Sequence, residues 1–190
     1  MTSKPKQRNE FFAWFKAIGL AILIVVIVRT FILGNYIVDG PSMMPTLHNS
    51  DRLIVNKINY RFAEPKRFDV IIFHATQNDD YVKRVIGLPG DTIRYTNDRL
   101  YINDKPVDEP FLDQYKRQLL TGQLTWNFTL KGLTGKSRVP KGKLFVMGDN
   151  RRNSIDSRAL PYHFISEKEV VGKVDLRYWP LKRFGIIHRY

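Results

Sequence analysis

A serine between two prolines is the residue of this sequence best placed to act as a nucleophile. Residues 40–47 read GPSMMPTL, so that Pro41 comes directly before Ser42 and Pro45 follows it. The two prolines restrict the backbone on both sides, and Gly40 lets another chain approach closely. Such a turn can hold a hydroxyl rigidly for attack on a carbonyl. A proline-rich turn without a catalytic role has the same sequence, so this segment alone leaves both interpretations open.

The candidate base for this serine is a lysine. A lysine accepts a proton only as the neutral amine, so burial must lower its pKa from about 10.4. Lys83 lies in the apolar segment YVKRVIGL, where strand alternation places it on one face with Tyr81 and Val85. A lysine on a solvated strand face would have the same pattern. The four histidines show no spacing for metal ligation or a Ser-His-Asp order, and we expect ordinary surface or core roles for them: His48, His74, His163 and His188.

Other groups that carry chemistry in proteins are absent from the sequence or unremarkable in their pattern. The chain has no cysteine, which excludes disulfides, thiolate metal sites and a cysteine nucleophile. The carboxylate pairs Asp79-Asp80 and Asp108-Glu109 indicate solvated turns, and no glycine-rich segment forms a phosphate loop. We therefore expect neither a metal nor a cofactor.

The net charge of +13, from 31 Lys and Arg against 18 Asp and Glu, fits two kinds of partner. Nucleic acid is one, and an anionic lipid surface beside the domain is the other. The basic residues occur as short, separated pairs rather than as one tract, so the charge does not decide between these partners. The length of 190 residues is that of one domain with its own core.

Residues 11–33 form an apolar stretch that only Lys16 and Arg29 interrupt. Its uncharged centre is 12 residues long, which alone fits a signal-peptide core or a buried helix. Both basic side chains can snorkel to the headgroups, and no small-x-small cleavage site follows. The sequence therefore predicts an uncleaved transmembrane anchor. The basic residues in 1–10 favour a cytoplasmic N-terminus, with 34–190 outside the membrane.

The rest of the chain has the pattern of strands rather than helices. The only helix that we expect is a short one near 111–120, inside a polar segment, 111–137, that its composition predicts to be a flexible insertion. A hairpin is predicted over 92–107, with turns at 96–98 and 103–104. β-branched and aromatic runs predict the other strands: 36–38, 52–56, 70–73, 81–86, 143–147 and 170–178.

Four segments together resemble, in order, the motifs of the bacterial type I signal peptidases, and the match runs over most of the chain. The resemblance implies a mainly β fold, a coiled antiparallel sheet domain behind one transmembrane helix. It also implies a serine endopeptidase in the plasma membrane that removes signal peptides from exported preproteins after small-x-small sites. The segments are IVDGPSMMPTL (37–47), NSDRLIVNK (49–57), YVKRVIGLPGD (81–91) and GDNRRNSIDSR (148–158).

The same resemblance implies roles for single residues. Ser42 is expected to be the nucleophile, Lys83 the general base, and Ser154 the residue that orients the lysine amine. Gly40 stands where part of the family has an oxyanion-stabilising serine. The oxyanion hole is therefore expected to use backbone N–H groups of Ser42 and Gly40, as in a Gram-positive type of enzyme.

Two further sets of residues follow from the resemblance. The first is structural support behind the site, in which the acids are expected to pair with Arg84: Arg84, Asp149, Asp156 and Arg158. The second is the substrate pocket for the side chains before the cut: Tyr36, Val38, Met43, Leu47, Asp80, Tyr81 and Val82.

Three rival interpretations remain at this point. One is a membrane-tethered binding domain of the same fold without catalysis. A second is a self-cleaving repressor with a Ser–Lys pair, which would need a DNA-binding region where this chain has residues 11–33. The third is a cationic nucleic-acid binder. The resemblance favours signal peptides and the lipid bilayer as partners, without nucleic acid or metal.

Overall fold

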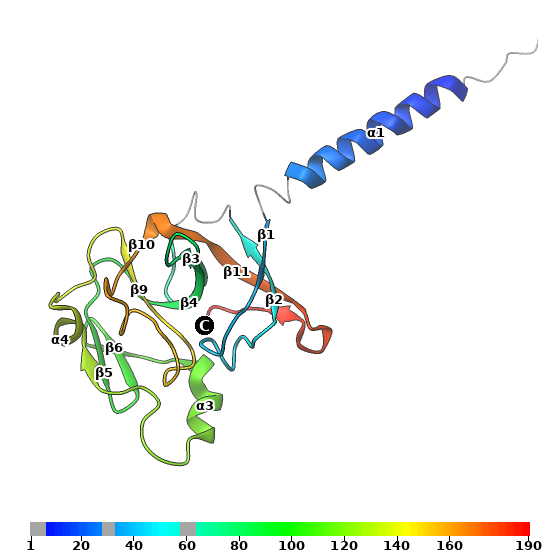
Figure 1. The fold of residues 1–190 in the computed structure, drawn as a ribbon. Helices are drawn as coiled ribbons and strands as arrows, with labels where there is room; N and C mark the ends of the chain where they lie inside the picture. Colours follow the sequence, from blue (N-terminus) through cyan, green and yellow to red (C-terminus); the bar gives the residue numbers. More distant parts are fainter. Residues whose placement is uncertain (1–6, 28–32, 58–63) are drawn as a thin grey trace, which may run out of the picture.

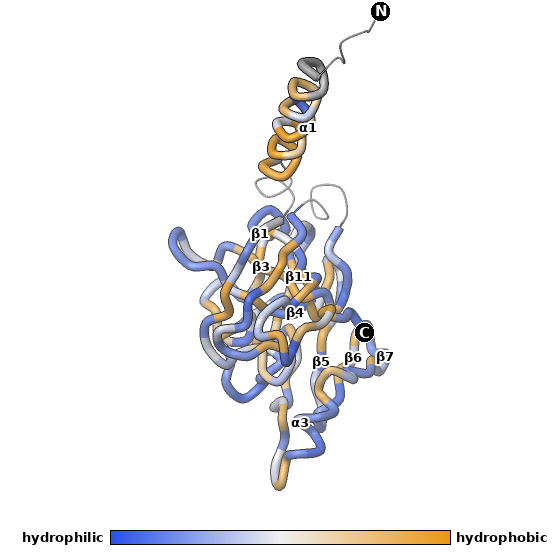
Figure 2. The backbone as a smooth tube through the Cα atoms, turned by 90° about the vertical axis from the view of Figure 1, so that its right-hand side faces the viewer, coloured by the Kyte–Doolittle hydropathy of each residue, from blue (hydrophilic) through white to orange (hydrophobic). Residues whose placement is uncertain are grey.

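A β domain preceded by one helix makes up the structure, a computed structural model that describes residues 7–27, 33–57 and 64–190. The helix, α1 (Gln7–Ile27), extends away from the β domain in Figure 1. Its described side chains, from Phe11 to Val26, are all exposed, and Figure 2 shows their hydrophobic character. Among the described residues, no helix has both the length and the apolar character required to cross a bilayer. Residues 28–32 of the expected anchor lie outside the described part.

Two antiparallel sheets form the β domain, which confirms the mainly β prediction. The larger sheet has the order β1-β2-β11-β3-β4-β9-β10, with β12 paired to β11, and the smaller has the order β7-β6-β5-β8. The larger sheet contains β1 (Leu33–Ile37), β2 (Arg52–Asn56), β3 (Val70–His74), β4 (Asp80–Gly87), β9 (Lys143–Met147), β10 (Ile165–Ser166), β11 (Val170–Trp179) and β12 (Gly185–Ile186). The smaller contains β5 (Ile93–Thr96), β6 (Arg99–Ile102), β7 (Lys105–Val107) and β8 (Phe128–Thr129).

Strand β11 joins the two halves of the larger sheet. It pairs with β2 on one side and with β3 on the other, with bulges where its register shifts. The turn after β1 carries Ser42, while β4 beside β3 carries Lys83. Strand β11 therefore joins the hairpin that includes the turn of Ser42 to the hairpin that carries Lys83.

The hairpin over 92–107 forms as the turn residues predict. Asn97 and Asp98 have φ of 52° and 59°, and Asn103 and Asp104 have φ of 51° and 62°. Left-handed φ at both central residues is the geometry of a type I′ turn, whose twist matches that of the flanking strands. Asn and Asp tolerate this conformation, so the sequence signal and the structure agree.

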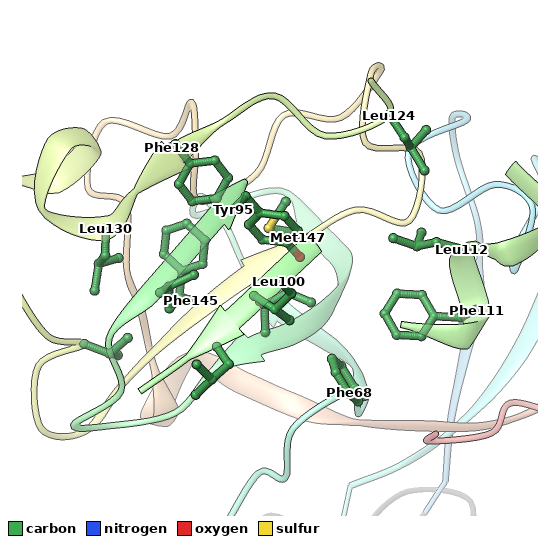
Figure 3. Close-up of a cluster of buried hydrophobic side chains, with 14 residues drawn as sticks. Phe68, Tyr95, Leu100, Phe111, Leu112, Leu124, Phe128, Leu130, Phe145 and Met147 are labelled. Atoms are coloured by element: carbon green, nitrogen blue, oxygen red, sulfur yellow. The ribbon is translucent and has the colours of Figure 1, made fainter. Parts of the chain in front are cut away.

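The largest hydrophobic cluster lies between the smaller sheet and the β4–β9 part of the larger one. Figure 3 shows Tyr95, Phe128 and Phe145 side by side in it, and their rings are 5.0 and 6.3 Å apart between neighbouring centroids. Full burial of such a side chain contributes about 1.5–3 kcal/mol. This cluster holds the two sheets together.

The segment 111–137, expected to be a flexible insertion, supplies part of this cluster. It contains most of η2 (Pro110–Leu112), then α3 (Asp113–Gln118), β8 and α4 (Leu130–Thr134). Its flexibility stays a prediction, but its apolar residues are packed on the domain. The buried ones are Phe111, Leu112, Leu124, Phe128 and Leu130.

Shortening Phe128 to alanine should test how firmly this segment is attached. Phe128 is 7% exposed and packs on Tyr95 and Phe145. We expect Phe128→Ala to lower the free energy of unfolding by about 3 kcal/mol, measured by urea denaturation. The matched control is Leu120→Ala in the same segment, where the side chain is 96% exposed and the change should stay within about 0.5 kcal/mol. Equal effects of the two substitutions would contradict the packing described here.

Candidate active site

Ser42 lies in the turn that follows β1, and a distant loop fixes its backbone. The Asn150 N–H donates to the Ser42 carbonyl oxygen at 3.0 Å, and the Asn150 side-chain amide donates to the Pro41 carbonyl oxygen at 3.1 Å. Within the turn, the Met44 N–H donates to the Pro41 carbonyl oxygen at 3.0 Å. The Ser42 hydroxyl is therefore presented from a backbone that is held from two sides.

Lys83 and Ser42 are in direct contact. The Lys83 Nζ donates to Ser42 Oγ at 2.9 Å and to the Val82 carbonyl oxygen at 3.0 Å. Lys83 is only 4% exposed, because β4 lies between β3 and β9 inside the larger sheet. The sequence placed these residues 41 positions apart, and the fold brings them within hydrogen-bond distance.

Burial lowers the pKa of Lys83 to about 8, because desolvation disfavours the ammonium. The negative charges of Asp156 and Asp149 raise the same pKa and so oppose part of this effect. With a pKa of about 8, roughly a tenth of the amine is neutral at pH 7, far more than for an exposed lysine. The environment thus supplies the neutral amine that a lysine base requires.

Two buried ion pairs lie behind this contact. Arg84 binds Asp149 through both carboxylate oxygens, at 2.8 and 2.7 Å, and both side chains are fully buried. Arg158 binds Asp156 in the same way, at 2.8 and 2.7 Å. The expected pairing of Asp156 with Arg84 is therefore wrong. Asp156 faces the arginine two residues away, and only Asp149 reaches Arg84.

A third buried pair was missed by the sequence. Glu109 is 3% exposed and its carboxylate accepts from Arg151 at 2.5 Å and from the Tyr95 hydroxyl at 2.7 Å. The prediction of a solvated turn is therefore wrong for Glu109. Arg151 also donates to the Tyr95 hydroxyl at 2.8 Å, which ties β5 of the smaller sheet to the loop behind the serine. No local pattern distinguishes this glutamate from an exposed one, because its partner lies 42 residues away.

A cleft of about 460 Å³ opens in front of Ser42 and Lys83. Five of the seven expected pocket residues line it: Tyr36, Val38, Asp80, Tyr81 and Val82. The other two, Met43 and Leu47, are fully buried in the hydrophobic cluster that also contains Leu53 and Val55. The sequence also missed residues that line the cleft, among them Ile37, Asp39, Asn78, Asp79, Asn153 and Ile155.

The match to a family model decides what kind of protein carries this site. Residues 11–179 match the model described as "Signal peptidase, peptidase S26". This chain belongs to the peptidase S26 family of signal peptidases. The family that the sequence motifs resembled is thereby confirmed.

Members of this family from Gram-positive bacteria are similar over almost the whole chain. The chain is 52% identical to "Signal peptidase I" of Bacillus caldolyticus, over 97% of this chain and 98% of that protein. It is 44% identical to "Signal peptidase IB" of Staphylococcus aureus (strain Mu50 / ATCC 700699), over 93% and 94%. A crystal structure of a signal peptidase I from Enterococcus faecalis V583 matches with a TM-score of 0.54 and 40% identity, covering 58% of this chain and 96% of that one.

The serine expected to orient the lysine in an S26 peptidase lies close to the site without bonding to it here. Ser154 Oγ is buried and has no hydrogen-bond partner within the described residues. Gly148 lies against it, and a Cβ on Gly148 would overlap both Ser154 Oγ and the Ser42 carbonyl oxygen. The orienting role of Ser154 stays a prediction. Glycine at position 148 is what allows the two serines to approach the same point.

The backbone donors expected for an oxyanion hole differ in their availability. The Gly40 N–H already donates to the Asn49 side-chain oxygen at 2.9 Å, so Asn49 satisfies it. Gly40 itself has φ of +89°, a backbone conformation that favours glycine. The Ser42 N–H forms no hydrogen bond to any other described residue. Of the two expected donors, Ser42 alone has an N–H that is free for a ligand.

A methyl group at position 148 should push apart the Ser42 backbone and the Ser154 side chain. We expect Gly148→Ala to lower peptidase activity by about 100-fold, because the Cβ displaces the Ser42 backbone or Ser154. Activity and Tm are measured together. Gly185→Ala is the control, because a Cβ there meets open space, and it should change neither quantity. Full activity of Gly148→Ala would contradict the close approach described above.

Proposed function

We propose that this chain is a type I signal peptidase, a serine endopeptidase that removes N-terminal signal peptides from exported preproteins. The hydrogen bond of 2.9 Å from the buried Lys83 Nζ to Ser42 Oγ supports this proposal most directly. Ser42 acts as the nucleophile and Lys83 as its base. Membership of the S26 family and the relatives' names support the substrate class.

The chemistry follows from the state of the lysine. The neutral Lys83 amine takes the Ser42 proton as Oγ attacks the scissile carbonyl, and the Ser42 N–H faces the negative charge that develops on the carbonyl oxygen. The resulting ammonium then donates this proton to the leaving amine as the peptide bond breaks. A water molecule, deprotonated by the neutral amine, hydrolyses the acyl-enzyme and restores Ser42.

The cleft fits an extended peptide. Tyr36 on β1 and Tyr81 on β4 line it. Val38, which is 4% exposed, adds an apolar surface to the same cleft. A leader segment that lies along these strands is held by its main chain, while the shallow apolar walls exclude bulky side chains. This arrangement favours small residues before the cut, in a small-x-small pattern.

Residues 11–33 serve in this proposal as a single membrane anchor, with 1–10 in the cytoplasm and 34–190 outside the plasma membrane. The support is the exposed apolar surface of α1, on which Phe11, Trp14 and Phe15 are 69–70% exposed. The part of α1 that belongs to this segment, residues 11–27, is about 26 Å long, somewhat less than the hydrocarbon thickness of about 30 Å. An anchored enzyme and a leader in the same bilayer meet at a high effective concentration.

Substitution of either partner should abolish cleavage. We expect Ser42→Ala and Lys83→Arg each to lower kcat/KM on a preprotein with an Ala-x-Ala site by at least about a thousandfold. Arginine keeps the positive charge but stays protonated, so it cannot act as a base. The exposed residues Ser137 and Lys131 provide the controls Ser137→Ala and Lys131→Arg, which should keep full activity. Cleavage that survives in either active-site variant would show that the assignment of Ser42 and Lys83 is wrong, and no cleavage by the unmodified chain would favour a non-catalytic binding domain.

The dependence of kcat/KM on pH should show the ionisation of Lys83. Because the active form is the neutral amine, kcat/KM should rise with pH and level off above the Lys83 pKa of about 8. Below that pH the logarithm of kcat/KM should fall by one unit per pH unit. The measurement is a cleavage assay at constant ionic strength. An inflection near pH 6.5 instead would indicate a histidine and remove Lys83 from the role of base.

A further inference from the structure

A second cavity, of about 270 Å³, adjoins Pro45 and Thr46 in the turn that carries Ser42. Thr46, the fourth residue after Ser42, lines it together with Gln114, Arg117, Arg177, His188 and Tyr190. These residues come from the turn, α3, β11 and the C-terminal segment. None of the residues that line the cavity, all in the described part of the chain, is acidic. Arg117 and Arg177 give its lining positive charge, and it shares no described residue with the peptide cleft.

Arg177 is held in this cavity in one orientation. Its Nη1 donates to the Thr46 carbonyl oxygen at 2.8 Å, and its Nε donates to the Arg183 carbonyl oxygen at 2.5 Å. The side chain keeps 15% of its surface exposed. Within the described residues, no hydrogen bond uses Nη2 of Arg177. A fixed guanidinium with a free edge is ready to bind an anion without loss of side-chain freedom.

The nearest carboxylate does not neutralise this cavity. Asp51, which is fully buried, accepts from Arg177 at 3.4 Å and from Arg183 at 2.6 Å. One negative charge is thus shared by two arginines. Arg117, in the last turn of α3, adds another positive charge without an ion-pair partner in the described chain. His188 adds a ring nitrogen that can donate.

We propose that this cavity binds a phosphate group, either free phosphate or the phosphate of a lipid headgroup. Two guanidinium groups match the charge and the several acceptor oxygens of phosphate. The cavity is slightly smaller than the sites that hold drug-sized ligands, which favours one small anionic group. This proposal does not rest on the proposed function, because it concerns different residues and a different ligand.

The site reaches the nucleophile turn through one residue. Thr46 accepts from Arg177 with its carbonyl oxygen, while its hydroxyl donates to Asp149 at 2.5 Å. Asp149 is the carboxylate that Arg84 binds behind Lys83. Arg177 therefore lies two hydrogen bonds away from Asp149, and a phosphate on its free edge would lie three away.

Binding should be measured on the full chain in a neutral detergent, by the Tm and without any substrate. Inorganic phosphate at ten times its Kd should raise the Tm by about 3–6 °C above a sodium chloride control of equal ionic strength. Dihexanoylphosphatidylglycerol below its micelle concentration forms a second arm. Saturation by phosphate indicates a free-anion site, and saturation by the lipid alone indicates a headgroup site.

Substitutions test whether phosphate binds in this cavity. Arg117→Gln and His188→Ala should each weaken binding by about tenfold, and both should keep peptidase activity because neither residue contacts Ser42 or Lys83. Lys116→Gln removes the same charge from α3 without lining the cavity, so it should bind like the unmodified chain. The proposal is overturned if neither ligand saturates, or if both cavity variants bind as tightly as Lys116→Gln.

Discussion

An amine kept out of water next to a serine is the constraint on which the rest of the site depends. Lys83 is buried, and desolvation lowers its pKa to about 8. Two carboxylates near it, Asp149 and Asp156, act against this by favouring the ammonium. Each of them is bound through both oxygens by its own arginine. Arg84 and Arg158 therefore offset the negative charge of these carboxylates, which would otherwise favour the protonated form of Lys83.

The backbone of the turn that carries Ser42 is also fixed, by hydrogen bonds from other parts of the fold. The Ser42 carbonyl oxygen accepts from Asn150, and Thr46 farther along the turn is fixed at both its carbonyl and its hydroxyl. The loop that supplies Asn150 is in turn tied to the smaller sheet through Arg151 and Glu109. Positioning the nucleophile thus uses both sheets, although only the larger one carries Ser42 and Lys83.

The sequence predicted those parts of the structure that depend on local patterns. The bounds of β2 and β9 agree with the apolar runs, and the Asn-Asp turns form as their side chains require. Motif resemblance placed Ser42, Lys83 and the residues behind them. What it could not supply were contacts between distant residues: the Glu109–Arg151 pair, the partner of Asp156, and Asn49 on the Gly40 amide. Such pairings depend on how the two sheets pack against each other, and the types of the single residues do not predict this packing.

The strand order has a consequence for the chain during its synthesis. The hairpin of β1 and β2 and the hairpin of β3 and β4 do not pair with each other, because β11 lies between them. Residues 170–179 are among the last to be made, so these two hairpins become neighbours of one strand in the same sheet only after β11 has been made. Besides β11, the loop of Asn150, which follows β9, also joins the turn with Ser42 to the part of the sheet that carries Lys83.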